Sequence, residues 1–163
     1  MAGSKKPRKA HRPRPVSAVG GLFAIQKKLD DAALAEPMTD DQIGDLALAF
    51  RLAFEAMIGG AADEQQWSTC VCSLNIAMVL AERGIGPECI PQIKQAMEGA
   101  FRARLRAKRL QSWGFDGAAI QAIKTAFELH ERQIEKATKG ELREAIFEVR
   151  ARIDEGNVFQ EAE

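Results

Sequence analysis

The sequence contains few of the residues that most often carry catalysis. Its 163 residues include no tyrosine and two histidines. It also lacks a glycine-rich phosphate loop, an HExxH motif, a CxxC pair and a GxSxG motif, each of which places reactive groups at a fixed spacing. We therefore expect a protein that is not an enzyme and that holds neither a cofactor nor a metal ion.

Cysteine is scarce and odd in number. Cys70 and Cys72 are two residues apart, so on a helix their side chains would point about 200° apart. They could then neither share a metal ion nor form a disulfide with each other, and Cys89 stands alone in the sequence. Such thiols are typical of a reducing compartment, so we expect free, mostly buried cysteines in a cytoplasmic protein.

Long apolar runs are also missing. No segment is apolar over the stretch of about 20 residues that a membrane-spanning helix needs. The basic N-terminus is not followed directly by an apolar stretch, as it would be in a secretory signal peptide. We therefore expect no membrane partner and no signal peptide.

The residues that are present fit a folded domain. Apolar residues make up 46% of the chain and charged residues 28%, which is ordinary for a globular protein. No stretch shows the sustained alternation of a β-strand, whereas helical periodicity recurs along the chain. We predict an all-α fold, an antiparallel bundle of five or six helices. Residues 1–16 would form a disordered basic arm, 17–156 the helical domain and 157–163 a frayed acidic tail.

The longest apolar helical run extends from Trp67 to Arg83. Apolar residues cover one face of this run and widen it most of the way round. A helix that is apolar on nearly all sides must be surrounded by other helices. We therefore place this segment at the centre of the bundle.

Capping residues and helix breakers predict the other boundaries. A weaker first helix is expected at about 18–35, and a second helix would end near Ile58. The fourth helix would run from Pro91 to Leu110 and close at Trp113-Gly114, and the last would end near Gly156. The expected caps are Thr39 with Gln42, Asp63 with Gln66, Asp116, and Thr138 with Glu141.

The fourth helix has two features that affect packing. Pro91 disfavours α-helical geometry at Ile90, and the tight link 84–87 predicts that this helix folds back antiparallel to the central one. Its expected core stripe consists of Ile93, Met97, Phe101 and Leu105.

The strongest functional signal is a basic run at the N-terminus. Residues 1–16 hold six basic residues and no acidic one, so the remainder of the chain is acidic overall. The six are Lys5, Lys6, Arg8, Lys9, Arg12 and Arg14. Such a run attracts phosphates or acidic protein surfaces, although it could also solubilise the chain or dock on its own acidic body. No aromatic residue is interleaved with these charges, so base stacking is not expected there.

A second group of basic residues lies in the fourth predicted helix. Arg102, Arg106 and Arg109 cluster on one side, and Trp113 adjoins them as a possible contact anchor. Arg104 and Lys108 fall on the side expected to face the core, so they would either extend past the core or bend toward solvent. The competing and more common interpretation is a solvated face that pairs with the protein's own carboxylates.

His130 is the one histidine inside the predicted domain. It lies in the apolar stripe of the fifth helix, which favours a histidine at the edge of the core with a satisfied hydrogen bond. A catalytic base would need a nucleophile within reach, and no recognisable pattern supplies one. Glu128, Glu131 and Glu135 are near it in sequence, but the ExxH spacing of helical di-iron sites is absent.

The run from Lys5 to Val16 resembles the start of a group of short uncharacterised proteins from phages and prophages of Gram-negative bacteria. Those proteins begin with a KKxRKxYRPRPV-like sequence, and here His11 stands where tyrosine is usual. The segments 74–77, 81–86 and 128–131 are also similar to that group. The resemblance implies a phage or prophage origin but no activity and no site residues.

Together these features predict a non-enzymatic phage or prophage accessory protein in the cytoplasm of a host cell. It would bind an acidic surface of a host or phage protein. The first alternative is a nucleic-acid-binding protein that contacts DNA or RNA through the same charges without reading sequence. The second alternative is a small enzyme that uses His130.

Overall fold

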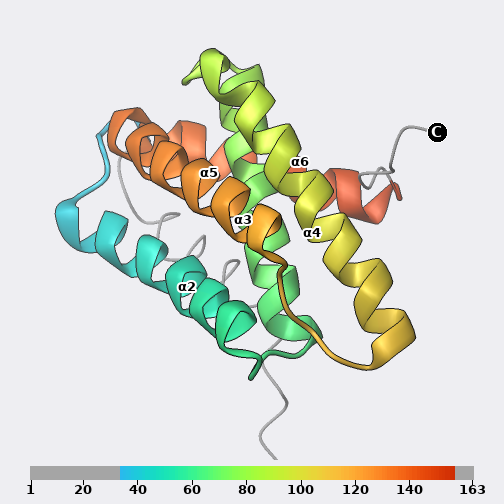
Figure 1. Cartoon of the computed structure of the whole chain (residues 1–163). Coiled ribbons are helices and arrows are strands. Elements are labelled where there is room, and N and C mark those ends of the chain that lie inside the picture. Colours follow the sequence, from blue (N-terminus) through green and yellow to red (C-terminus); the bar gives the residue numbers. More distant parts are fainter. Residues whose placement is uncertain (1–33, 157–163) are drawn as a thin grey trace, which may run out of the picture.

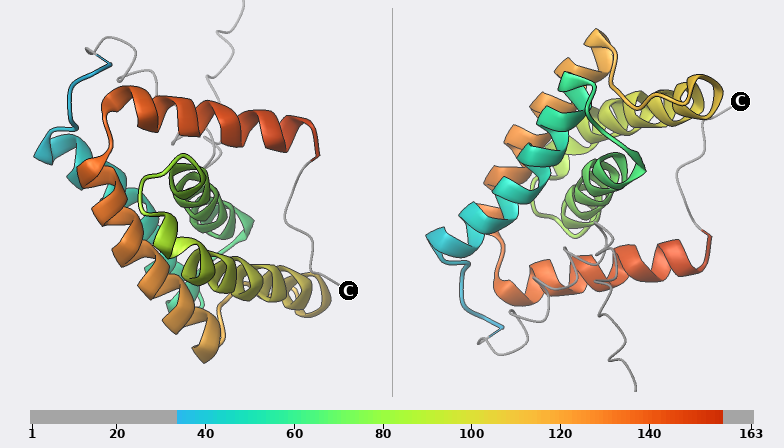
Figure 2. Two further views of the ribbon diagram at one scale, coloured as in Figure 1. Left: turned by 90° about the horizontal axis from the view of Figure 1, so that it is seen from above. Right: turned by 90° about the horizontal axis from the view of Figure 1, so that it is seen from below.

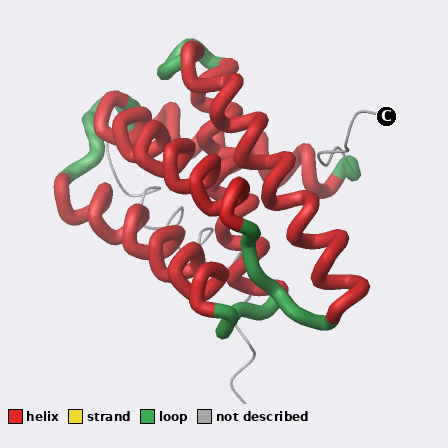
Figure 3. Tube along the Cα trace, in the orientation of Figure 1, coloured by secondary structure: helices red, strands yellow, loops and turns green. Residues whose placement is uncertain are grey.

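The computed structural model describes residues 34–156, and these residues form a bundle of five α-helices and one short 3-10 helix (Figure 1). The helices are α2 (Asp40–Gly59), α3 (Glu64–Glu82), η1 (Pro87–Cys89), α4 (Ile90–Leu110), α5 (Gly117–Lys136) and α6 (Lys139–Asp154). Figure 3 shows that helices and loops account for all of the described residues, without a strand. The predicted all-α bundle is therefore confirmed.

Three predicted segments fall wholly or mostly outside the described residues. They are the basic arm 1–16, nearly all of the helix at 18–35 and the tail 157–163. The two described residues of 18–35, Leu34 and Ala35, form a turn.

Helix α3 occupies the centre of the bundle, as predicted. It contacts α2, α4, α5 and α6, and Figure 2 shows it end-on with the other helices around it. From Thr69 to Ala81 every residue is buried except Val71 and Asn75, which are partly exposed. The apolar composition of α3 is therefore explained by neighbours on nearly every side.

The predicted helix starts are confirmed. Each capping side chain accepts a hydrogen bond from a backbone N–H in the first turn, which satisfies a donor that has no partner inside the helix. Reciprocal capping boxes form at Thr39 with Gln42, Asp63 with Gln66, and Thr138 with Glu141, and Asp116 caps α5.

At the two ends of α4, the geometry predicted for Ile90 was wrong and the end at Leu110 is confirmed. Ile90 adopts α-helical geometry (φ −52°, ψ −46°), because Pro91 lies in the first turn, where a missing N–H costs little. The expected irregularity falls instead on η1. The helix ends at Leu110, as predicted, but Gln111, which turns into the left-handed region at φ 54°, closes it in place of Trp113-Gly114.

The core face of α4 also differs from the predicted stripe. Leu105 is 48% exposed, although Ile93 and Met97 are buried. The other buried residues of α4 are small, namely Ala96, Gly99, Ala100, Ala103 and Ala107. Helix α4 also packs against α5. At Gly99 the approach is so close that a Cβ atom would lie 2.8 Å from the Cβ of Ala119. Small side chains therefore set the position of α4 on α5.

The chain before α2 is fastened to the start of α6. The Lys139 ammonium lies 2.9 Å from Glu36 Oε2, and the Lys139 side chain is 8% exposed. The backbone N–H groups of Lys139 and Gly140 donate to the carbonyls of Glu36 and Leu34. These contacts join segments about a hundred residues apart in sequence.

Candidate partner-binding site

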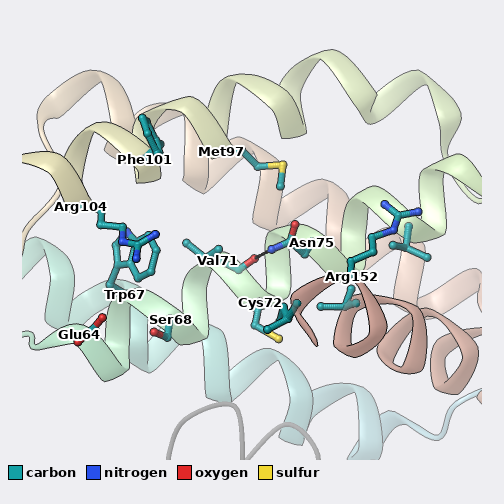
Figure 4. Close-up of a pocket in the computed structure, with 13 residues that line it drawn as sticks. Glu64, Trp67, Ser68, Val71, Cys72, Asn75, Met97, Phe101, Arg104 and Arg152 are labelled. Atoms are coloured by element: carbon teal, nitrogen blue, oxygen red, sulfur yellow. Dashed lines mark hydrogen bonds between the residues drawn. The ribbon is translucent and has the colours of Figure 1, made fainter. Parts of the chain in front are cut away.

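A groove of about 300 Å³ lies between α3, α4 and α6 (Figure 4). Trp67, Val71 and Asn75 of α3 line its floor. Met97 and Phe101 line the side formed by α4, and the end of α6 closes the opposite side with Val149 and Ile153. The groove is therefore mainly apolar.

The floor of the groove is the part of α3 that no described helix covers. Val71 and Asn75 are the two partly exposed residues within the buried stretch of α3, and both face the groove. The Asn75 side-chain amide donates to the Val71 carbonyl at 3.0 Å, so its N–H group is satisfied within the helix. An apolar strip is thus left open where a further segment could pack.

Trp67 connects α3 to α4 at one end of the groove. Its indole Nε1–H donates to the Ala100 carbonyl at 2.8 Å. The centroid of its ring lies 5.6 Å from the centroid of the Trp113 ring. The Arg104 guanidinium carbon lies 5.3 Å from the centroid of the Trp67 ring. Trp113, which the sequence suggested as a contact anchor, is therefore half-buried against Trp67.

Arg104 bends over the Trp67 ring beside the groove, as Figure 4 shows. The Arg104 side chain is only partly exposed, whereas Lys108, the other cation expected on the core side, is exposed. The Nε of Arg104 is buried and has no hydrogen-bond partner in the structure of residues 34–156. A buried donor without an acceptor costs roughly 1–3 kcal/mol, so this guanidinium is suited to a carboxylate.

The predicted cluster of Arg102, Arg106 and Arg109 is divided by the structure. Arg106 lies 3.3 Å from Asp116 and also donates to the Gly114 carbonyl, so it fastens the loop between α4 and α5. The pKa of Asp116 is lowered, chiefly by the hydrogen bond from the backbone of Ala119 and further by Arg106 and Arg102. Arg106 is therefore engaged within the chain, as the competing interpretation of this basic group expected, and its role in partner binding stays a prediction.

The other cations of this helix lie on an exposed surface. We call Arg102, Leu105, Lys108, Arg109 and Leu110 the basic end of α4; all five are exposed. Within the described part of the chain, its three cations form no ion pair. The basic end of α4 thus presents positive charge and exposed leucine side chains together.

Arg152 stands at the other end of the groove from Arg104 (Figure 4). It lies 2.7 Å from Glu82 and 2.8 Å from Glu148. These two carboxylates raise the pKa of Arg152 through their hydrogen bonds. Arg152 is therefore already neutralised, whereas Arg104 is not.

His130 lies deeper in the core than the sequence suggested. It is 1% exposed, and its Nδ1 is 3.3 Å from Gln133 Oε1. The Gln133 amide nitrogen donates to the carbonyls of Ala77 and Ile85, so Oε1 is the atom that faces the ring and Nδ1 carries the hydrogen. Burial lowers the pKa of His130 to about 4. The predicted hydrogen bond is confirmed, and the ring is shielded from solvent.

The cysteines are free and buried, as predicted. Burial raises the pKa of Cys70 to about 12 and that of Cys72 to about 11, so both carry a proton at neutral pH. No group of three or more histidine, cysteine, aspartate or glutamate side chains within residues 34–156 is placed to hold a metal ion.

The sequence interpretation missed the groove. Its one signal was a polar stripe on an otherwise apolar helix, because Glu64, Ser68 and Asn75 share the side of α3 that faces the groove.

The predicted binding residues of the arm, Lys5 to Arg14, lie outside the described residues. Over the described part of the chain, no helix is both long and apolar enough to cross a membrane. Comparisons with protein-family models, curated proteins and solved structures found no match.

Proposed function

We propose that this protein is a non-enzymatic binding protein that engages an acidic surface of a partner protein, from a host or a phage. The proposed site combines the groove between α3, α4 and α6 with the basic end of α4. The observation that carries the proposal is Arg104, whose buried Nε has no acceptor among the described residues.

The chemistry of the site favours a carboxylate next to an apolar side chain. Trp67 covers one face of the Arg104 guanidinium, which leaves the edge of the group for an in-plane hydrogen bond. Charge-assisted hydrogen bonds of this kind are about twice as strong as neutral ones. The apolar floor beside Arg104 would hold a leucine or phenylalanine of the same partner segment.

The same geometry disfavours the nucleic-acid alternative. Proteins that bind single strands usually offer open aromatic faces on which bases stack. Here the Trp67 ring is in contact with Arg104 and Trp113. The basic end of α4 could attract phosphates, but an apolar groove gives a phosphate backbone nothing to pack against. The buried position of His130 likewise gives no support to an enzyme that uses this residue.

The test measures binding of a short amphipathic peptide of leucine and glutamate residues, and of duplex DNA, at several salt concentrations. We expect the peptide to bind and Arg104→Gln to weaken it at least tenfold, or about 1.4 kcal/mol. Lys124→Glu reverses an exposed charge on α5 and serves as the matched control. If only DNA binds, and deletion of residues 1–16 lowers its salt dependence, the protein-binding proposal is wrong and the nucleic-acid alternative is favoured.

A further inference from the structure

The groove opens directly beside the end of the described chain. Ile153 lines the groove, and α6 ends one residue later at Asp154. Gly156 then adopts a left-handed conformation (φ 74°), and its N–H donates to the Ile153 carbonyl at 3.1 Å. A glycine in this position ends a helix and redirects the chain. The residues that follow therefore start at the rim of the groove.

The sequence after this turn matches the groove in order and in charge. It reads Asn-Val-Phe-Gln-Glu-Ala-Glu from 157 to 163. The apolar pair Val158-Phe159 is followed by the acids Glu161 and Glu163. Beside Ile153 the groove presents apolar side chains and the already paired Arg152. At its other end, near Glu64, lies Arg104, whose Nε has no acceptor among the described residues.

The length of this segment also fits. Seven extended residues reach roughly 24 Å. The groove extends along α3 from Glu64 to Val79, sixteen residues whose fifteen helical steps span roughly 22 Å. A segment of seven residues that starts beside Ile153 is therefore long enough to reach Arg104.

We propose that residues 157–163 bind back across the groove, with Phe159 in its apolar section and Glu161 or Glu163 at Arg104. The segment then competes with the acidic partner for the same site. The competition with a partner rests on the proposed function, whereas the binding of residues 157–163 in the groove does not.

Two other occupants are less well matched. The N-terminal segment joins the described chain at Leu34. The Leu34 carbonyl accepts a hydrogen bond from the backbone N–H of Gly140, at the end of α6 opposite Ile153. The N-terminal segment would have to cross roughly 20 Å before it reached the groove, which lowers its effective concentration there. A second copy of the chain pays the full cost of association, which a tethered segment largely avoids.

The two tryptophans make the contact directly measurable. The chain has no tyrosine, and both Trp67 and Trp113 lie at the Arg104 end of the groove. Intrinsic fluorescence therefore reports on this region alone. We expect Phe159→Ala and deletion of 157–163 to shift tryptophan emission to the red and to increase quenching by acrylamide.

Phe147→Ala is the matched control, because Phe147 is 42% exposed on α6 and does not line the groove. In the protein lacking 157–163, a synthetic peptide of that sequence should restore the signal, and Arg104→Gln should weaken this peptide at least tenfold. Circular dichroism establishes that each variant is folded. An unchanged signal in both tail variants would refute the internal contact.

The remaining outcomes separate the alternatives. A signal that changes on deletion of 1–33, or with protein concentration, but not with the tail variants would assign the groove to another occupant and overturn the proposal. Deletion of the tail should also tighten the leucine–glutamate peptide about tenfold if the tail fills nine-tenths of the grooves. Restoration by the tail peptide without any binding of the leucine–glutamate peptide would support the internal contact and refute the proposed function.

Discussion

Replacement of Gly99 by alanine tests whether small side chains set the distance between α4 and α5. In an open helix this change is favourable by about 1 kcal/mol, because alanine has the higher helix propensity. At Gly99 the added Cβ would lie 2.8 Å from the Cβ and 3.0 Å from the Cα of Ala119. The second of these is a backbone atom, so the helices themselves must separate.

We expect the steric cost to exceed the gain. Overpacking of a well-packed interface costs about 1–3 kcal/mol. The net result should be a free energy of unfolding up to about 2 kcal/mol lower than in the wild type, with a lower Tm. Urea unfolding followed by circular dichroism gives the first quantity, and a thermal scan gives the second.

Gly44→Ala supplies the control, because Gly44 also lies within a helix but has no atom within 4 Å of the position of an added Cβ. It should stabilise the protein by up to about 1 kcal/mol. Adding Ala119→Gly to Gly99→Ala should recover part of the loss, as a favourable coupling in a double-mutant cycle. If Gly99→Ala stabilises the protein as much as Gly44→Ala does, the close approach does not constrain the fold.

Three further predictions concern the core. The pKa of His130 is about 4 in the folded protein against an ordinary value of 6.5, so between these pH values the unfolded chain binds a proton that the folded protein does not. The free energy of unfolding should therefore fall by roughly 3 kcal/mol as the pH drops through this window. Urea unfolding at several pH values should show that the free energy of unfolding depends less on pH in His130→Gln than in the wild type. Phe50→Ala should cost about 3–5 kcal/mol in urea unfolding, because Phe50 is fully buried and its ring packs on Phe127. Cys70 and Cys72 should react with a thiol reagent in native protein only slowly, and rapidly in urea, because burial keeps them protonated and covered.

The predictions from sequence succeeded where the cause was local. A capping box depends on two side chains three residues apart, so Thr39 with Gln42 and Thr138 with Glu141 could be identified directly. The central position of α3 followed from its own composition, because a helix that is apolar on nearly all sides needs neighbours on all sides.

The predictions failed where the cause was tertiary. Leu105 was placed in the core because bulky apolar residues usually lie there, but α4 meets α5 through alanine and glycine. The internal partners of Arg106, Asp116 and Gly114, could not be read from the sequence, because they lie in a loop whose path depends on the packing. The groove could not be predicted because α6, which closes one side of it, is distant in sequence from α3 and α4.

The ion pair between Lys139 and Glu36 joins the start of α6 to the segment before α2, so the helices from α2 to α5 lie between two linked residues. In a bundle joined only by short turns, a terminal helix can fray alone, but here the segment before α2 is held to the start of α6 by an ion pair whose Lys139 side chain is buried. Hydrogen exchange at the first turns of these two helices should therefore report one shared opening event, and their assembly must await contact between sequence-distant parts of the chain.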